Sequence, residues 1–224
     1  MKKVTQNAFT LAEVLITIGI IGVVASLSVP TIMGNYQKKT YVTSLHKVYN
    51  EISQAIEQVM TDKNAETIDE AGLTTQAALN EWVQTYFRVS HNCQGDSTKC
   101  MAPNNQYKKL KKSSSNYMTT RTGHNYFGLS SGAVIRPLLG KEGNKRFNLL
   151  VDTNGKNAPN TLGRDVFFIG VYNNGGIDDY AAGKNAPLSN TDRNSLFTSQ
   201  CNANDDSPWG CFGKVLSDGW QMNY

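Results

Sequence analysis

The residue with the most unusual chemical setting is Glu13, because it interrupts an otherwise apolar segment. It is the only charged residue between Phe9 and Met33, and the stretch from Val14 to Val29 has no charge. A carboxylate in hydrocarbon costs roughly 2.5–3.5 kcal/mol, so such a group usually has a partner or a task. If the chain were cut before Phe9, the new α-ammonium group of a neighbouring copy could pair with Glu13 in a polymer. The alternative is a charge that snorkels to the membrane interface.

A second candidate is a polar loop in which oxygen-bearing side chains surround an Asn-Gly turn. Asp152, Asn154 and Asp165 supply carboxylate and amide oxygens, which suit a hard cation such as calcium. The loop is not an EF-hand, since its glycine is misplaced and no Glu closes it. Asn154-Gly155 by itself is a strong turn signal. The sequence therefore favours a structural turn, with calcium as the alternative and Asp178-Asp179 as a second acidic source.

The four cysteines form two locally spaced pairs, Cys93 with Cys100 and Cys201 with Cys211. Four cysteines allow three connectivities, and we favour the two local bridges because each closes one short loop. His91 beside Cys93 could suggest zinc, but the spacing lacks the tight arrangement of zinc ligands. Disulfides are typical of proteins outside the reducing cytoplasm, so we expect the body of the protein to be external.

A possible nucleophile lies in Gly128-Leu-Ser-Ser-Gly132, which has the spacing of a nucleophile elbow. That motif needs a strand before it and a helix after it, whereas the following residues, Ala133–Leu139, have the pattern of a strand. We therefore expect no enzyme.

A basic run offers a site for nucleic acid. It comprises Lys108, Lys109, Lys111 and Lys112. Lysines favour phosphate contacts, and Tyr107 and Tyr117 nearby could stack on bases. The formal net charge is only +4, and it falls to +2 without Lys2 and Lys3, which is no general argument for nucleic-acid binding. The run is more typical of a solvated loop, so DNA is not the favoured partner.

The elements that position these residues divide the chain into four parts. Residues 1–8 are a short basic leader, and residues 9–33 are an apolar helix of transmembrane length. Residues 34–62 continue the helix with apolar residues at three- and four-residue spacing. Residues 63–224 remain for a globular head, which is enough for one domain of typical size. Pro30 predicts a kink, because proline lacks an N–H and clashes with the preceding turn.

The head shows one further helical pattern and three strand-like runs. The helix is expected near Thr74–Arg88, and the strands near Ala133–Leu139, Arg146–Asp152 and Asp165–Tyr172. A sheet that packs on a long helix gives an α+β fold.

The N-terminal residues Ala8-Phe-Thr-Leu-Ala-Glu-Val-Leu-Ile16 resemble the processing and methylation motif of type IV prepilins and type II secretion pseudopilins. The resemblance implies a cut between Ala8 and Phe9, methylation of Phe9, and a role for Glu13 in assembly. Pro30 matches the helix-kinking proline of that family. One departure is Ala8, where the family usually has Gly. The motif covers only the first quarter of the chain.

This resemblance implies a pilin-like fold, in which a kinked N-terminal helix, half of it transmembrane, packs against an antiparallel sheet. It also implies a structural subunit of a type II secretion pseudopilus or type IV pilus. The loop around Asp152 looks like a loop in the heads of pseudopilin-like proteins, some of which bind calcium. The Cys201–Cys211 loop resembles the cystine-bounded loop near the C-terminus of many pilins.

The implied partners are the prepilin peptidase, like and related pilin subunits, the membrane and secreted cargo. The implied location is the bacterial inner membrane, with a single span and the head outside the cytoplasm, and then an external fibre. Three alternatives stay open. The chain could be an anchored binding module that does not polymerise, a DNA-uptake minor pilin, or a secreted protein cut after Ala25 by signal peptidase.

Overall fold

The computed structural model describes residues 9–93, 95–112 and 125–224. The chain divides into two compact units, Met1–Lys39 and Thr40–Tyr224. The expected leader and its cleavage-site residue Ala8 lie outside the described residues.

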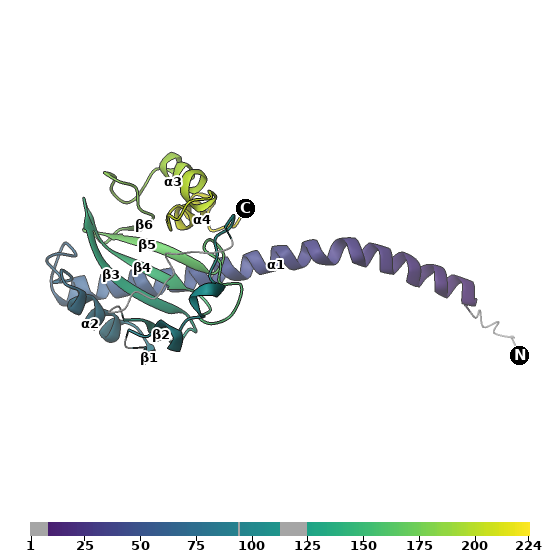
Figure 1. Ribbon diagram of the computed structural model, residues 1–224, viewed down its shortest axis with the longest axis horizontal. Helices are drawn as coiled ribbons and strands as arrows, with labels where there is room; N and C mark the ends of the chain where they lie inside the picture. The colour runs from purple at the N-terminus through teal and green to yellow at the C-terminus, as the bar shows by residue number, and fades with distance from the viewer. Residues whose placement is uncertain (1–8, 94, 113–124) are drawn as a thin grey trace, which may run out of the picture. The chain divides into compact units, whose positions relative to one another are not determined.

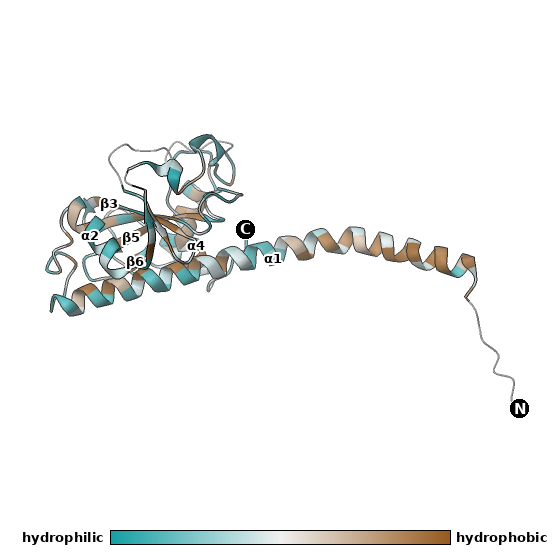
Figure 2. Ribbon diagram, turned by 90° about the horizontal axis from the view of Figure 1, so that it is seen from below, coloured by the Kyte–Doolittle hydropathy of each residue, from teal (hydrophilic) through white to brown (hydrophobic). Residues whose placement is uncertain are grey.

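The first unit contains the start of α1, which runs from Leu11 to Asp62. Its apolar side chains from Phe9 to Tyr36 are exposed, and it is brown along this stretch in Figure 2. By length and composition, α1 is the one helix among the described residues that could cross a membrane. The helix continues through Pro30 without interruption, and the kink stays a prediction.

In the second unit α1 becomes amphipathic, and its colours alternate in Figure 2. Its buried residues recur at three- and four-residue spacing and are Val42, Leu45, Val48, Ile52, Ala55, Ile56 and Val59. They belong to the core of the head. Trp82 of α2 (Gln76–Tyr86) ties the two helices together, because its Nε1 donates a 3.1 Å hydrogen bond to the Ala55 carbonyl.

The head is built on a six-stranded antiparallel sheet in the order β1-β2-β3-β4-β5-β6 (Figure 1). The strands are β1 (Val89–Asn92), β2 (Phe127–Leu129), β3 (Val134–Glu142), β4 (Lys145–Asp152), β5 (Val166–Tyr172) and β6 (Ile177–Asp178). Each strand pairs with its neighbour in sequence. The α+β, pilin-like layout expected from the sequence is therefore confirmed.

Strand β5, which pairs with β4 and with the edge strand β6, is buried along its whole length because both of its faces are covered. On one face Phe147 of the adjacent β4 packs against Trp82 of α2, with ring centroids 5.4 Å apart. On the other face Phe168 meets Trp209, at 5.8 Å. The segment around Trp209 therefore covers the second face of β5.

The C-terminal part folds into two short helices that the sequence analysis did not predict. The first, α3 (Asn190–Leu196), leads into a π-helical turn at Phe197–Cys201, and α4 (Cys211–Ser217) follows after a loop. Short 3₁₀ turns lie at Ser97–Lys99 and Asn104–Gln106.

Candidate functional site

Thr10 and Glu13 form a capping box at the start of α1. Glu13 Oε2 accepts hydrogen bonds from the backbone N–H and the hydroxyl of Thr10, both at 2.8 Å, and Thr10 Oγ1 accepts the Glu13 N–H at 3.3 Å. Glu13 thus has an intrachain partner, which the sequence analysis missed. The signal was present, since Thr-x-x-Glu before an apolar run is the sequence pattern of a capping box. Phe9 directly precedes this cap and is 86% exposed.

The two predicted loop carboxylates lie together at the junction of β4 and β5. Asp152 ends β4, and Asp165 immediately precedes β5. Both residues are fully buried. Asp152 accepts a hydrogen bond from the Tyr107 hydroxyl at 2.7 Å and another from the Asn154 N–H at 3.2 Å. Asp165 accepts the backbone N–H groups of Asn160 at 2.8 Å and of Thr161 at 2.7 Å.

Burial sets the electrostatics of this pair. It raises the pKa of Asp152 to about 7, against the lowering effect of the Tyr107 hydrogen bond, and the charge of Asp165 adds to the rise. Burial likewise raises the pKa of Asp165, although its backbone hydrogen bonds oppose the shift. A cation beside the two carboxylates would favour their charged forms.

The donor chemistry of the loop fits a hard cation. Besides the two carboxylates, the amide oxygens of Asn154 and Asn160 are buried without a hydrogen-bond partner. Oxygen ligands of this kind are those that calcium prefers. Within residues 9–93, 95–112 and 125–224, no three His, Cys, Asp or Glu side chains gather as a metal site. A calcium ion here would therefore depend on amide and carbonyl oxygens as well as on Asp152 and Asp165.

The second acidic source, Asp178-Asp179, is used inside the fold. Asp178 accepts hydrogen bonds from Arg193 Nε at 3.0 Å and Nη2 at 2.6 Å. Asp179 accepts the backbone N–H groups of Gly210 and Gly213 at 2.8–2.9 Å, and burial raises its pKa to about 6. These contacts fasten α3 and α4 to the edge of the sheet near β6.

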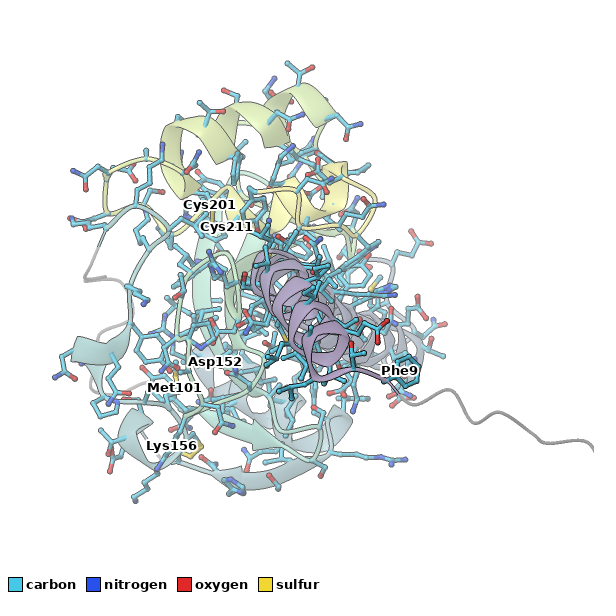
Figure 3. All side chains as sticks on the ribbon, turned by 90° about the vertical axis from the view of Figure 1, so that its right-hand side faces the viewer. Phe9, Met101, Asp152, Lys156, Cys201 and Cys211 are labelled. Carbon is cyan, nitrogen blue, oxygen red and sulfur yellow. A yellow bond between two sulfur atoms is a disulfide. The ribbon has the colours of Figure 1, made fainter. Side chains whose placement is uncertain are left out.

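The cysteines are joined in the two local pairs that their spacing favours, Cys93–Cys100 and Cys201–Cys211. Cys93 and Cys100 are therefore not zinc ligands. Figure 3 labels the second pair. This disulfide packs against the loop between β4 and β5, because a Cβ atom at Gly163 would lie 3.0 Å from Cys211 Sγ.

The basic run is not a set of free cations. Lys109 is buried, and Lys112 forms an ion pair with Asp206, which leaves Lys108 and Lys111 exposed. Tyr107 is also buried and cannot stack on a base, and Tyr117 lies outside the described residues. The structure thus corrects the surface on which the DNA alternative depended. One of its four lysines and one of its two tyrosines are buried in the head, and a second lysine, Lys112, is held in an ion pair at the rim.

The nucleophile-elbow pattern lies in a turn between two strands. Ser130 follows β2 and precedes β3, and its hydroxyl donates to the Arg88 carbonyl at 3.0 Å. The motif requires a strand followed by a helix, so the pattern has the wrong structural setting.

Comparison with known proteins gives one curated relative. The chain is 36% identical over 73 residues to the type II secretion system core protein G of Aeromonas hydrophila. The match covers 33% of this chain and 50% of that protein, so the chain spans about half the length of the curated relative it matches. No family model and no solved structure matches the chain. The similarity supports a relationship to the type II secretion pseudopilins.

Proposed function

We propose that the chain is a structural subunit of a type II secretion pseudopilus or a related type IV fibre. One observation carries this proposal: the first part of α1 exposes a continuous apolar surface and has a single acidic residue, Glu13, in its first turn. The α+β head and the similarity to a type II secretion core protein support it.

In any stable state of the protein, the exposed apolar stretch of α1 must be shielded from water. Burying one Leu, Ile or Val side chain contributes about 1.5–3 kcal/mol, and some fifteen large apolar side chains of this stretch are exposed. A bilayer can cover them before assembly, and the helices of neighbouring copies can cover them in a fibre. The same surface thus serves both a membrane-bound subunit and a polymer.

Glu13 distinguishes such a subunit from a simple anchor. A membrane anchor gains nothing from a carboxylate in its apolar segment, whereas a fibre can use it to fix the axial register between copies. The two hydrogen bonds from Thr10 reach only Oε2, and a carboxylate has roughly four acceptor sites. Glu13 can therefore cap its own helix and still accept the ammonium group of another chain.

Processing is part of the proposal. Prepilin peptidase would cut between Ala8 and Phe9, and the new N-terminus at Phe9 would be methylated. The head would lie outside the cytoplasm, where both disulfides are stable, and would contact related subunits or secreted cargo.

The experiment that tests processing is intact-mass measurement and N-terminal sequencing of the protein from its native membrane. A start at methylated Phe9 is the expected result. A start at Ser26 would mean signal-peptidase release and would refute the fibre proposal. An intact Met1 would identify an uncut, membrane-anchored module.

We also propose calcium at the loop between β4 and β5. The orphaned amide oxygens of Asn154 and Asn160 favour it, together with the paired carboxylates of Asp152 and Asp165. A calcium ion shared by the carboxylates of Asp152 and Asp165 would offset the repulsion between these two buried negative charges.

A further inference from the structure

The side chain of Lys109 ends in a cage of oxygen atoms. It is 0% exposed, and its ammonium nitrogen lies 3.0 Å from the Gln200 carbonyl oxygen, 2.9 Å from both the carbonyl and the carboxylate oxygen of Asp205, and 2.6 Å from the Ser207 carbonyl. An ammonium group has three N–H donors, so four oxygens share them. Lysine is rarely buried to this degree unless it is paired, and here one carboxylate and three carbonyls provide the pairing.

All four oxygens come from one short segment, Gln200–Ser207. It begins beside Cys201 and lies largely within the loop that the Cys201–Cys211 disulfide closes. Carbonyl oxygens that converge on one point repel one another unless a cation lies between them. A single carboxylate and several carbonyls are also the oxygen set that a bound metal ion would use. In this loop the chain supplies the cation itself.

The backbone around Lys109 is held by a second loop. Lys108 N–H donates to the Asn160 carbonyl at 3.1 Å, and Leu162 N–H donates to the Lys108 carbonyl at 2.9 Å. The Lys108 backbone and the Lys109 side chain together therefore connect the loop between β4 and β5 to the disulfide loop. Lys112 adds an ion pair with Asp206 at the rim, where both side chains are partly exposed.

We propose that segment Gln200–Ser207 is a cation-binding site whose resident ligand is the Lys109 ammonium group. The disulfide loop then keeps its conformation without a metal ion. If the lysine side chain is removed, the vacated cage should bind a small primary ammonium ion from solution. The proposal concerns the folded head and does not depend on fibre assembly.

The test uses the full-length chain in detergent micelles and compares Lys109→Ala with Lys112→Ala. Lys112→Ala is the matched control. It removes a lysine from the same segment, but Lys112 has one ion-pair partner, Asp206, at the rim. Hydrogen–deuterium exchange of peptides covering residues 200–210 measures the opening of the loop. We expect Lys109→Ala to speed exchange about tenfold or more, and Lys112→Ala to change it by less than about threefold.

Chemical rescue distinguishes a cation site from ordinary packing. Methylammonium chloride should slow exchange of residues 200–210 in Lys109→Ala and leave the wild type unchanged. Tetramethylammonium chloride has no N–H donor and should have no effect at equal ionic strength. Rescue by methylammonium alone supports the proposal. Equal rescue by both salts, or by neither, overturns it.

A measurement on the wild type keeps the proposal testable if Lys109→Ala does not fold. Brief acetylation of the native protein, followed by peptide mapping, compares the reactivity of individual lysines. Lys109 should be protected relative to the exposed Lys108 and Lys111, and reduction of the disulfide should remove that protection. Reactivity of Lys109 equal to that of its two neighbours in the native protein would refute the cage.

Discussion

Glu13 and Thr10 hold each other at the first turn of α1, since Glu13 Oε2 accepts two hydrogen bonds from Thr10 and Thr10 Oγ1 accepts the Glu13 N–H. The carboxylate is thus oriented before any second chain is present. The two roles that we propose for Glu13 can therefore be separated: one is to accept the hydrogen bonds that begin the helix, and the other is to offer its charge to a neighbouring copy.

The charge and the cap can be tested apart. Glu13→Gln keeps an oxygen that can accept from Thr10 but removes the charge, so we expect the protein to stay in the membrane and to be lost from sheared fibres. Thr10→Val keeps the charge and removes the capping hydroxyl. It should destabilise the start of the helix by about 0.5–2 kcal/mol but leave fibre assembly intact. Immunoblotting of the fibre and membrane fractions measures both.

The matched control for these variants is Glu57→Gln, which removes an exposed charge from the same helix. It should assemble like the wild type. If Thr10→Val were lost from fibres and Glu13→Gln were retained, the cap rather than the charge would carry the function of Glu13.

Asp152 should make the stability of the head depend on pH. Burial raises its pKa to about 7, above the value of about 3.9 in an unfolded chain. Its stabilising contribution is then fully present below about pH 4 and is lost as the pH rises through about 7. Asp152→Asn cannot ionise, so its free energy of unfolding relative to the wild type should increase by roughly 2–4 kcal/mol between pH 4 and pH 8.

Denaturant unfolding at several pH values in the presence of EGTA measures this difference. The control is Asp192→Asn, because the Ser189 hydroxyl hydrogen bond lowers the pKa of that partly exposed carboxylate. Asp192→Asn should not gain stability relative to the wild type as the pH rises. A constant difference between Asp152→Asn and the wild type would show that Asp152 has an ordinary pKa.

Calcium should oppose this loss of stability. At pH 8 a saturating concentration, about one hundred times the dissociation constant, would raise the free energy of unfolding by about 2.7 kcal/mol over the value in EGTA. Asp165→Asn should abolish the response, and Asp192→Asn should retain it. Thermal unfolding in millimolar calcium or EGTA measures the effect. An unchanged midpoint for the wild type would leave the loop as a structural turn.

Gly163 should not tolerate a side chain. Its φ angle is +87°, and a Cβ atom would lie 3.0 Å from Cys211 Sγ and 3.3 Å from Leu110 Cδ1. Gly163→Ala should therefore combine backbone strain with a steric clash and cost about 2–4 kcal/mol. Gly132→Ala is the matched control, since its φ is +90° and a Cβ atom there meets nothing within 4 Å. Equal thermal midpoints for the two variants would show that the contact with the disulfide is unimportant.

The sequence by itself determined the elements that follow from local periodicity. A continuous apolar run followed by a three- and four-residue stripe predicted both parts of α1, and α2 lies within the expected Thr74–Arg88. The long strands β3, β4 and β5 begin and end within a few residues of the prediction. These patterns are visible because each long element must bury its own apolar residues.

The tertiary structure alone decided where the short strands form and which polar side chains are buried. Strands β1, β2 and β6 have two to four residues and are defined by their partners, so no periodicity reveals them. Lys109 looked like a solvated charge, yet its acceptors lie more than ninety residues away in the chain. Tyr107 and Asp152 meet across 45 residues. Whether a polar group is buried with partners or exposed depends on contacts that form only when distant segments pack together.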